Sequence, residues 1–117
     1  MDALDGKYGV IIERNIEVPM RDGTILRADV WRPDFDGEFP VLIERTPYNK
    51  GTSSESNLKA GEFYGSHGYV TVVQDVRGRF ASDGEFYPFR DDGDGVNQDG
   101  FDTVEWVAEQ PWSNGKI

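Results

Sequence analysis

The run from Tyr69 to Val76 places the tightest constraint on what this chain can fold into. It is apolar over most of its length, rich in valine, and ends in Arg77-Gly78. A strand of this kind must be covered on both faces, which predicts a central strand of a sheet with further layers on either side. Residues 39–44 form a second short apolar run, which predicts another strand buried on both faces, as in a parallel sheet.

The rest of the chain supplies a hairpin before these strands and helices between and after them. Residues 1–15 are expected to form a lead-in strand region, and residues 16–33 a hairpin that turns at Asp22-Gly23. Residues 39–117 follow as strand, helix, strand and helix, with helices predicted over 58–67 and 101–108. This alternation predicts the α/β class, as an incomplete domain whose parallel strands are joined by crossover helices. The apolar residues that predict an amphipathic second helix are Phe101, Val104, Trp106, Val107 and Ala108.

Composition excludes several kinds of partner. The chain has 22 acidic and 12 basic residues and a net charge of −10, so its field repels phosphate backbones and anionic membranes. No apolar run approaches the roughly 18 residues of a membrane span, and the first residues lack the layout of a signal peptide. The lack of cysteine excludes disulfides and suits a reducing compartment, although exported proteins can also lack it. We therefore expect no nucleic-acid or membrane partner, and a cytoplasmic location.

A long acidic and glycine-rich segment, residues 79–100, separates the last predicted strand from the last predicted helix. The carboxylates of its run Asp91–Asp99 resemble those that coordinate Ca²⁺. Counted from Asp92, however, Val96 takes the fifth position of a calcium loop and Asn97 the position that requires glycine. We therefore predict a solvated loop, with no metal and no cofactor. Calcium binding below millimolar concentration in calorimetry would contradict this.

Three ordered blocks and a preceding hairpin motif carry a resemblance to a known family. The blocks are Arg45–Lys50 (RTPYNK), Gln74–Phe86 (QDVRGRFASDGEF), and Asp99–Trp106 running into Gln110–Lys116 (QPWSNGK). The hairpin motif is Met20–Thr24 (MRDGT), followed by Asp29–Pro33 (DVWRP). In this order and spacing, the chain from about residue 17 onward resembles the cocaine-esterase and X-prolyl dipeptidyl-peptidase group of α/β-hydrolase serine hydrolases. Several ordered blocks are far more specific than one short motif.

The resemblance implies acyl transfer by a serine, which a histidine activates and an aspartate supports, in the chain order Ser, Asp, His. In that family, the residues after the last block lead into a Gly-x-Ser-x-Gly nucleophile elbow. All three triad members would therefore lie beyond Ile117, and we expect this segment alone to be inactive. Only Tyr48 maps onto the family's catalytic apparatus. The resemblance implies that its phenol donates a hydrogen bond to the oxyanion.

Other residues that could carry catalysis have simpler structural interpretations. His67, the only histidine, is expected to lie at the end of a helix. Ser82 and Ser113 lack a Gly-x-Ser-x-Gly frame, and we expect them in turns and caps. Arg77 is expected to pair with Asp75 and fix the end of the strand.

Two alternatives to the hydrolase fragment stay open on sequence alone. One is a complete binding module that uses the acidic loop, and the other is one subunit of a split hydrolase. The substrate expected from the resemblance is a small-molecule ester, an amide or an X-Pro peptide. The edge of strand 41–44, where a fifth strand pairs in this fold, would be bare in this segment. We therefore expect the isolated segment to fold poorly or form homo-oligomers, and its partner to be the rest of the same domain.

Overall fold

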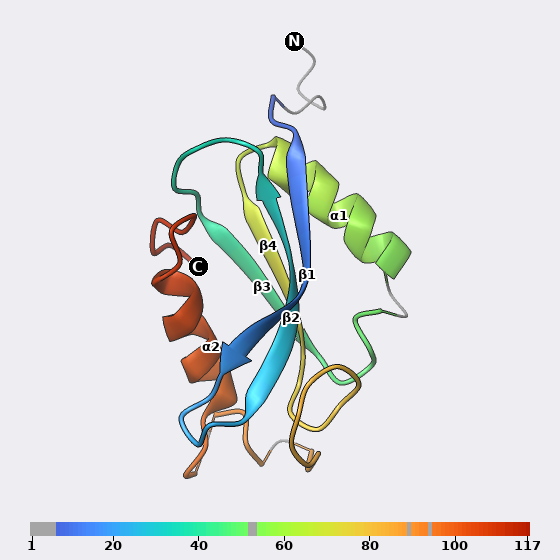
Figure 1. Cartoon of the computed structure of the whole chain (residues 1–117), viewed down its shortest axis with the longest axis vertical. Helices are drawn as coiled ribbons and strands as arrows, with labels where there is room; N and C mark the ends of the chain where they lie inside the picture. Colours follow the sequence, from blue (N-terminus) through green and yellow to red (C-terminus); the bar gives the residue numbers. More distant parts are fainter. Residues whose placement is uncertain (1–6, 52–53, 89, 94) are drawn as a thin grey trace.

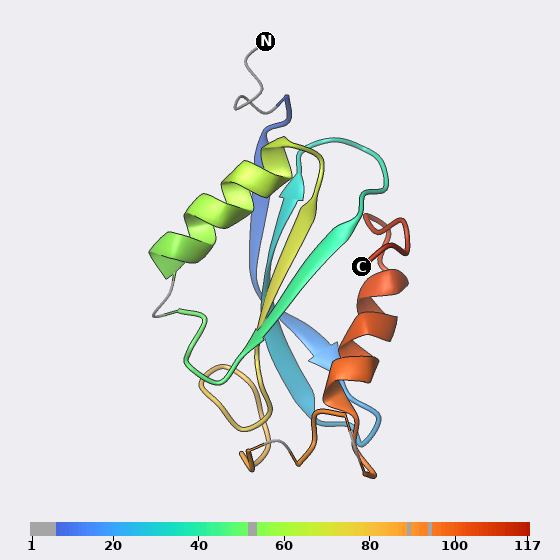
Figure 2. The same cartoon turned by 180° about the vertical axis from the view of Figure 1, so that it is seen from behind.

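A four-stranded mixed sheet with one helix on each face forms the body of the protein (Figures 1 and 2). The structure, a computed structural model, describes residues 7–51, 54–88, 90–93 and 95–117. The strands lie in the order β1-β2-β4-β3. The elements are β1 (Val10–Pro19), β2 (Ile25–Pro33), β3 (Val41–Thr46), α1 (Ser54–Ser66), β4 (Val70–Asp75) and α2 (Asp99–Ala108).

The predicted hairpin is present as the antiparallel pair of β1 and β2, but it begins at Val10 and so includes part of the predicted lead-in region 1–15. Residues 1–6 of that region lie outside the described residues. Its turn uses Gly23 at a φ of 86°, in the left-handed region that glycine adopts without strain. The Asp22 side chain accepts a hydrogen bond from the Thr24 N–H (3.0 Å), which closes the turn. β1 contains an irregularity between Glu13 and Ile16, where its register against β2 shifts.

The central strand is β4, as the apolar run predicted. Every one of its residues is buried, and it pairs with β2 antiparallel and with β3 parallel. The core on the α2 side of the sheet is built from side chains of all four strands and α2: Val18, Met20, Leu26, Ala28, Val30, Phe39, Val41, Val70, Val72 and Val107.

The expectation that residues 39–44 are buried on both faces is wrong for β3. Leu42 is 40% exposed, and only Val41 in this strand is buried. The physical reason is that β3 is the edge strand, and α1 packs mainly against β1, β2 and β4. The start of the β3 edge is nevertheless paired. Phe39 bridges Ser113 in parallel, and the Val41 N–H donates to the Lys116 carbonyl (2.9 Å).

Helix α1 packs against the sheet through a glycine. A Cβ built on Gly61 would lie 2.2 Å from the indole Cγ of Trp31, a side chain fully buried on β2. Any larger residue would therefore force the helix and the sheet apart.

We expect Gly61→Val to lower the free energy of unfolding by about 2–3 kcal/mol, because overpacking a core contact displaces either the helix or the indole. Chemical denaturation of the protein measures this. Gly93→Ala is the matched control, since a Cβ at Gly93 meets nothing within 4 Å. Equal stability of the two variants would contradict the close packing of α1.

Helix α2 covers the opposite face of the sheet from α1 (Figures 1 and 2). Its buried stripe consists of Asp99, Thr103 and Val107, spaced four residues apart. Phe101 and Val104, which the sequence assigned to the apolar face, are exposed, because the buried polar contacts of Asp99 and Thr103 set the rotation of the helix. Within the described parts of the chain, neither helix is long and apolar enough to cross a membrane.

Candidate active site

A cavity of about 510 Å³ opens beyond the carboxyl ends of β3 and β4. Ligands of open α/β sheets bind at this edge, because the loops that follow parallel strands converge there. One wall is apolar and the rest carries charge and a phenol. The lining residues are Arg45, Pro47, Tyr48, Val76, Arg79, Phe86, Pro88 and Asp92.

Tyr48 lies where the sequence predicted it, two residues beyond the end of β3. Its side chain is 80% exposed and lines the cavity. Both polar atoms of the Pro47–Tyr48 peptide group are hydrogen-bonded. The Tyr48 N–H donates to Thr46 Oγ1 (3.0 Å), and Arg79 Nε donates to the Pro47 carbonyl (3.0 Å). The loop therefore presents an accessible hydroxyl on a backbone fixed by hydrogen bonds.

The same loop contains a buried cation that the sequence analysis missed. Lys50 follows Tyr48 by two residues, and its side chain is only 6% exposed. Lysine is rarely buried without a charge partner, so its identity alone gave no signal. Asn49 between them has a φ of 74°, and its side chain accepts a hydrogen bond from the Gly51 N–H (2.9 Å).

Arg77 connects the β1–β2 turn to the first residue of α2. Its Nε and Nη2 donate to the two carboxylate oxygens of Asp99, each at 2.8 Å, and its Nη1 donates to Asp22 (2.7 Å) and Thr24 Oγ1 (2.8 Å). We call these four residues the Arg77 cluster. Asp99 in the first turn also places a negative charge at the positive end of the helix dipole.

The expected pairing of Arg77 with Asp75 is wrong. Asp75 ends β4 on the side of the sheet where Lys50 lies, and its carboxylate accepts hydrogen bonds from the backbone N–H groups of Lys50 (2.8 Å) and Ala81 (3.2 Å). Arg77 lies beyond the strand, beside α2. Two residues close in sequence thus belong to separate clusters.

The Arg77 cluster changes the acid–base properties of Asp22. Hydrogen bonding from Arg77 lowers the pKa of Asp22 well below its ordinary value, and the Thr24 N–H adds to this. The pKa of Asp102 is likewise lowered, first by its hydrogen bonds from the Arg21 side chain. Both carboxylates therefore favour the charged form in the folded state.

This shift predicts a pH dependence for Asp22→Asn. Because the folded-state pKa is lowered, the contribution of Asp22 is complete above its unfolded pKa of about 3.9 and is lost as the pH falls toward the folded value. We expect the variant to be less stable than the wild type by about 1 kcal/mol at pH 7, since the carboxylate is partly exposed. Urea denaturation should show the gap narrowing below about pH 3. A gap that stays constant from pH 7 to pH 2.5 or grows on acidification would contradict the assignment.

The structure gives His67, Ser82 and Ser113 structural contacts. His67 follows the last residue of α1, and its Nδ1 lies 2.7 Å from the Phe63 carbonyl. Ser82 Oγ donates to the Asp75 carbonyl (2.6 Å) and accepts from the Arg27 N–H (2.8 Å). Ser113 Oγ accepts from the Gly115 N–H (3.1 Å) in a turn.

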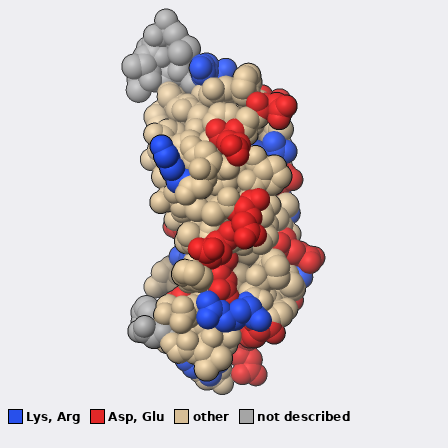
Figure 3. Space-filling view, turned by 90° about the vertical axis from the view of Figure 1, so that its left-hand side faces the viewer, with Lys and Arg blue, Asp and Glu red and all other residues tan. Residues whose placement is uncertain are grey.

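Carboxylates of the acidic loop are engaged in ion pairs with arginines. Asp92 pairs with Arg45 (2.8 Å), Asp91 with Arg90 (3.2 Å), and Asp99 with Arg77. Asp94 lies outside the described residues. Acidic side chains also predominate over basic ones on the molecular face that carries α2 (Figure 3).

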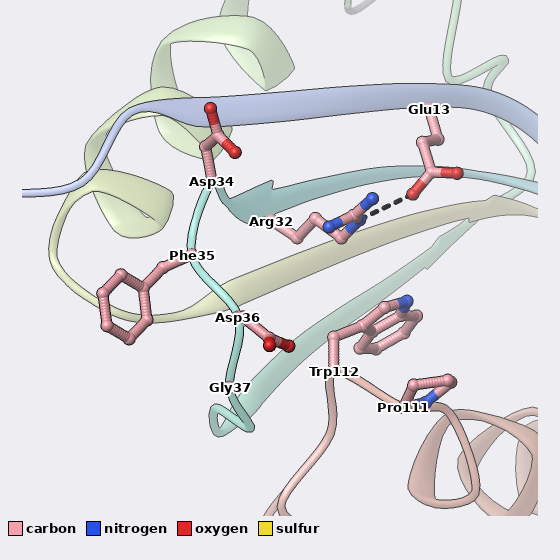
Figure 4. Close-up of a pocket in the computed structure, with 8 residues that line it drawn as sticks. All are labelled: Glu13, Arg32, Asp34, Phe35, Asp36, Gly37, Pro111 and Trp112. Carbon is pink, nitrogen blue, oxygen red and sulfur yellow. Dashed lines mark hydrogen bonds and ion pairs between the residues drawn. The ribbon is translucent and has the colours of Figure 1, made fainter.

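A second cavity, of about 590 Å³, lies at the opposite end of the sheet (Figure 4). It is lined by Glu13 and Arg32 of the hairpin, by the loop 34–37, and by Pro111 and Trp112. Arg32 Nε donates to Glu13 (2.7 Å), so two of the charged side chains that line this cavity neutralise each other. This end of the sheet lies away from Tyr48, so we assign the candidate active site to the cavity beyond β3 and β4.

The fold of this chain is similar to that of hydrolases of known structure. A CocE/NonD family hydrolase from Staphylococcus aureus aligns with 91% of this chain and 22% of its own, at 29% identity and a TM-score of 0.74. An α-amino acid ester hydrolase aligns with the whole chain and 22% of its own, at 26% identity and a TM-score of 0.68.

Sequence comparison gives the family. The model of the X-Pro dipeptidyl-peptidase (S15) family matches residues 22–117, and the chain belongs to this family. Cocaine esterase from Rhodococcus sp. (strain MB1 Bresler) is 43% identical over 97% of this chain, which corresponds to 19% of that esterase. The chain thus spans about a fifth of the length of these relatives. The resemblance predicted from the sequence blocks is confirmed.

Proposed function

We propose that this chain is the N-terminal part of the catalytic domain of a serine hydrolase that cleaves ester or amide bonds. In this proposal the serine, aspartate and histidine lie beyond Ile117, and Tyr48 supplies one donor of the oxyanion hole. The observation that carries the proposal is the exposed phenol of Tyr48 at a cavity beyond the carboxyl ends of β3 and β4. Membership of a peptidase family and similarity to an esterase support hydrolysis of acyl bonds.

The chemistry follows from where charge develops. When a serine hydroxyl attacks the substrate carbonyl, its proton passes to the histidine and the carbonyl oxygen becomes an oxyanion. A preorganised hydroxyl donor stabilises this charge without reorganising during the reaction. Tyr48 suits this task because the backbone of its loop is fixed while its hydroxyl is accessible.

The rest of the cavity suits the acyl group of a small substrate. Val76, Phe86 and Pro88 offer apolar contact. Arg79 stacks over the ring of Phe86 with its guanidinium 5.1 Å from the ring centroid, which holds that wall in place. We propose an ester, an amide or an X-Pro peptide as the substrate class.

Labelling with a fluorophosphonate probe tests the serine mechanism, because the probe reacts covalently with an activated serine. In the full-length protein we expect one labelled serine, located beyond Ile117 in a Gly-x-Ser-x-Gly sequence. Heat-denatured protein is the control and should not react. No label, or a label on Ser82 or Ser113, would refute the proposal. A label on a second, copurifying chain would instead identify a split hydrolase.

A further inference from the structure

The side chain of Lys50 points away from the cavity loop and contacts three strands of the sheet. Its Nζ donates to Asn15 Oδ1 (2.6 Å) and lies 3.0 Å from Asp29 Oδ1 and 4.0 Å from Asp75 Oδ2. Asp29 and Asp75 are buried almost completely. The ammonium therefore joins three strands, since Asn15 belongs to β1, Asp29 to β2 and Asp75 to β4. We call these four residues the Lys50 cluster.

The irregularity in β1 builds this cluster. Asn15 lies within it at a φ of 54°, and its N–H donates to Asp29 Oδ1 (3.0 Å) while its side chain accepts from Lys50. A β-bulge redirects a side chain out of the regular alternation of a strand. Asparagine is also one of the few residues other than glycine that tolerate a left-handed backbone. Asn15 thus contacts the Asp29 carboxylate through its backbone and the Lys50 ammonium through its side chain.

The charges of the Lys50 cluster balance when the neighbouring Arg14 is included. Lys50 lies between two buried carboxylates, and Arg14 Nη1 contacts the second oxygen of Asp29 (3.2 Å). Two cations therefore face two carboxylates. Loss of the lysine charge would leave Asp75 facing no cation among the ion pairs of the described residues, a costly state for a buried carboxylate.

The cluster also holds the backbone of the Tyr48 loop. Asp75 Oδ1 accepts the Lys50 N–H (2.8 Å) while its Oδ2 faces the ammonium of the same residue. Asn57 Nδ2 at the start of α1 donates to the Lys50 carbonyl (3.1 Å). The main chain two residues beyond Tyr48 is thereby fixed to the end of β4. Lys50 itself is not among the residues that line the cavity, so it does not touch a substrate there.

We propose that Lys50 is a positioning residue: through Asp75 and Asn15 its buried ammonium fixes the loop that presents the Tyr48 phenol. This inference rests on the proposed oxyanion role of Tyr48. Displacement of a catalytic group by about 1 Å can cost about 10²-fold in rate. Release of this loop would displace the Tyr48 hydroxyl and should therefore lower kcat.

A double-mutant cycle in the full-length protein tests the proposal, using hydrolysis of a p-nitrophenyl ester as the assay. We expect Lys50→Met to lower kcat about 10²-fold with little change in KM. In a Tyr48→Phe background the same substitution should cost less than about threefold, because the group that it misplaces has already been removed. Arg32→Met, which breaks an ion pair of the same hairpin at the far end of the sheet, is the control and should leave kcat unchanged.

A milder variant keeps the test valid if Lys50→Met does not fold. Asn15→Gly retains the left-handed backbone and removes only the acceptor of the ammonium, and we expect it to lower kcat about tenfold. If either variant lowers kcat by the same factor in the Tyr48→Phe background as in the wild type, the positioning role is wrong.

Amide hydrogen exchange separates this inference from the proposed function. We expect the Lys50 and Gly51 amides to exchange at least about tenfold faster in either variant, with the Val107 amide in α2 unchanged. Unchanged exchange in the loop would overturn the inference even if Tyr48 is an oxyanion donor. Faster exchange with no effect of Tyr48→Phe on turnover would support the structural link and refute the catalytic role of Tyr48.

Discussion

Tyr48→Phe in the full-length protein should lower kcat by about 10²–10³-fold with little change in KM. A donor to the oxyanion makes its hydrogen bond fully only as negative charge develops, so its loss appears in the transition state and not in substrate binding. Phenylalanine preserves the ring and removes only the hydroxyl. Steady-state kinetics with an activated ester measure both constants.

Tyr69→Phe is the matched control for this experiment. Tyr69 is partly exposed and precedes β4 at the opposite end of the strand from the cavity. We expect its turnover to equal that of the wild type. Unchanged turnover in Tyr48→Phe, or an equal loss in both variants, would contradict the oxyanion role.

The second large effect concerns stability. Arg77→Met should lower the free energy of unfolding by about 3–5 kcal/mol, because removing one partner of a buried ion pair leaves an uncompensated charge. Asp99, which is 0% exposed, would lose both of its hydrogen bonds from the guanidinium. Asp22 and the β1–β2 turn would lose their link to α2. Urea denaturation of the full-length protein measures the change.

Two further variants separate this effect from the loss of any arginine. Arg90→Met removes a guanidinium that is more than half exposed, and should cost less than about 1 kcal/mol. Asp99→Asn combined with Arg77→Met removes the stranded charge, so the double variant should be more stable than Arg77→Met alone. A cost below about 1 kcal/mol for Arg77→Met itself would show that the cluster is not a major stabilising contact.

Local sequence patterns were sufficient to predict the central strand, the hairpin and the position of Tyr48, because each depends on residues that are neighbours in the chain. The valine-rich β4 could be predicted because a strand buried on both faces needs apolar residues at successive positions. The hairpin could be predicted because Asp22-Gly23 supplies the turn conformation directly. Tyr48 could be placed because its motif follows β3 immediately in the chain.

The ionic contacts could not be predicted in the same way. Arg77 reaches Asp22 and Asp99, which are 55 and 22 residues away, and nothing in the local sequence specifies either partner. Lys50 could not be recognised as buried, because its charge is balanced only where β1, β2 and β4 meet. Such contacts depend on the register of the sheet, which is set by the whole fold.

The most direct test of the oxyanion role of Tyr48 is a crystal structure of the full-length protein with a phosphonate bound covalently to its serine. The phosphonyl oxygen imitates the oxyanion of the acyl-transfer intermediate. We expect the Tyr48 hydroxyl to lie about 2.7–3.1 Å from that oxygen, with the Lys50 N–H of the same loop still hydrogen-bonded to Asp75. A Tyr48 side chain directed away from the phosphonate, with other groups donating to the oxygen, would contradict this role.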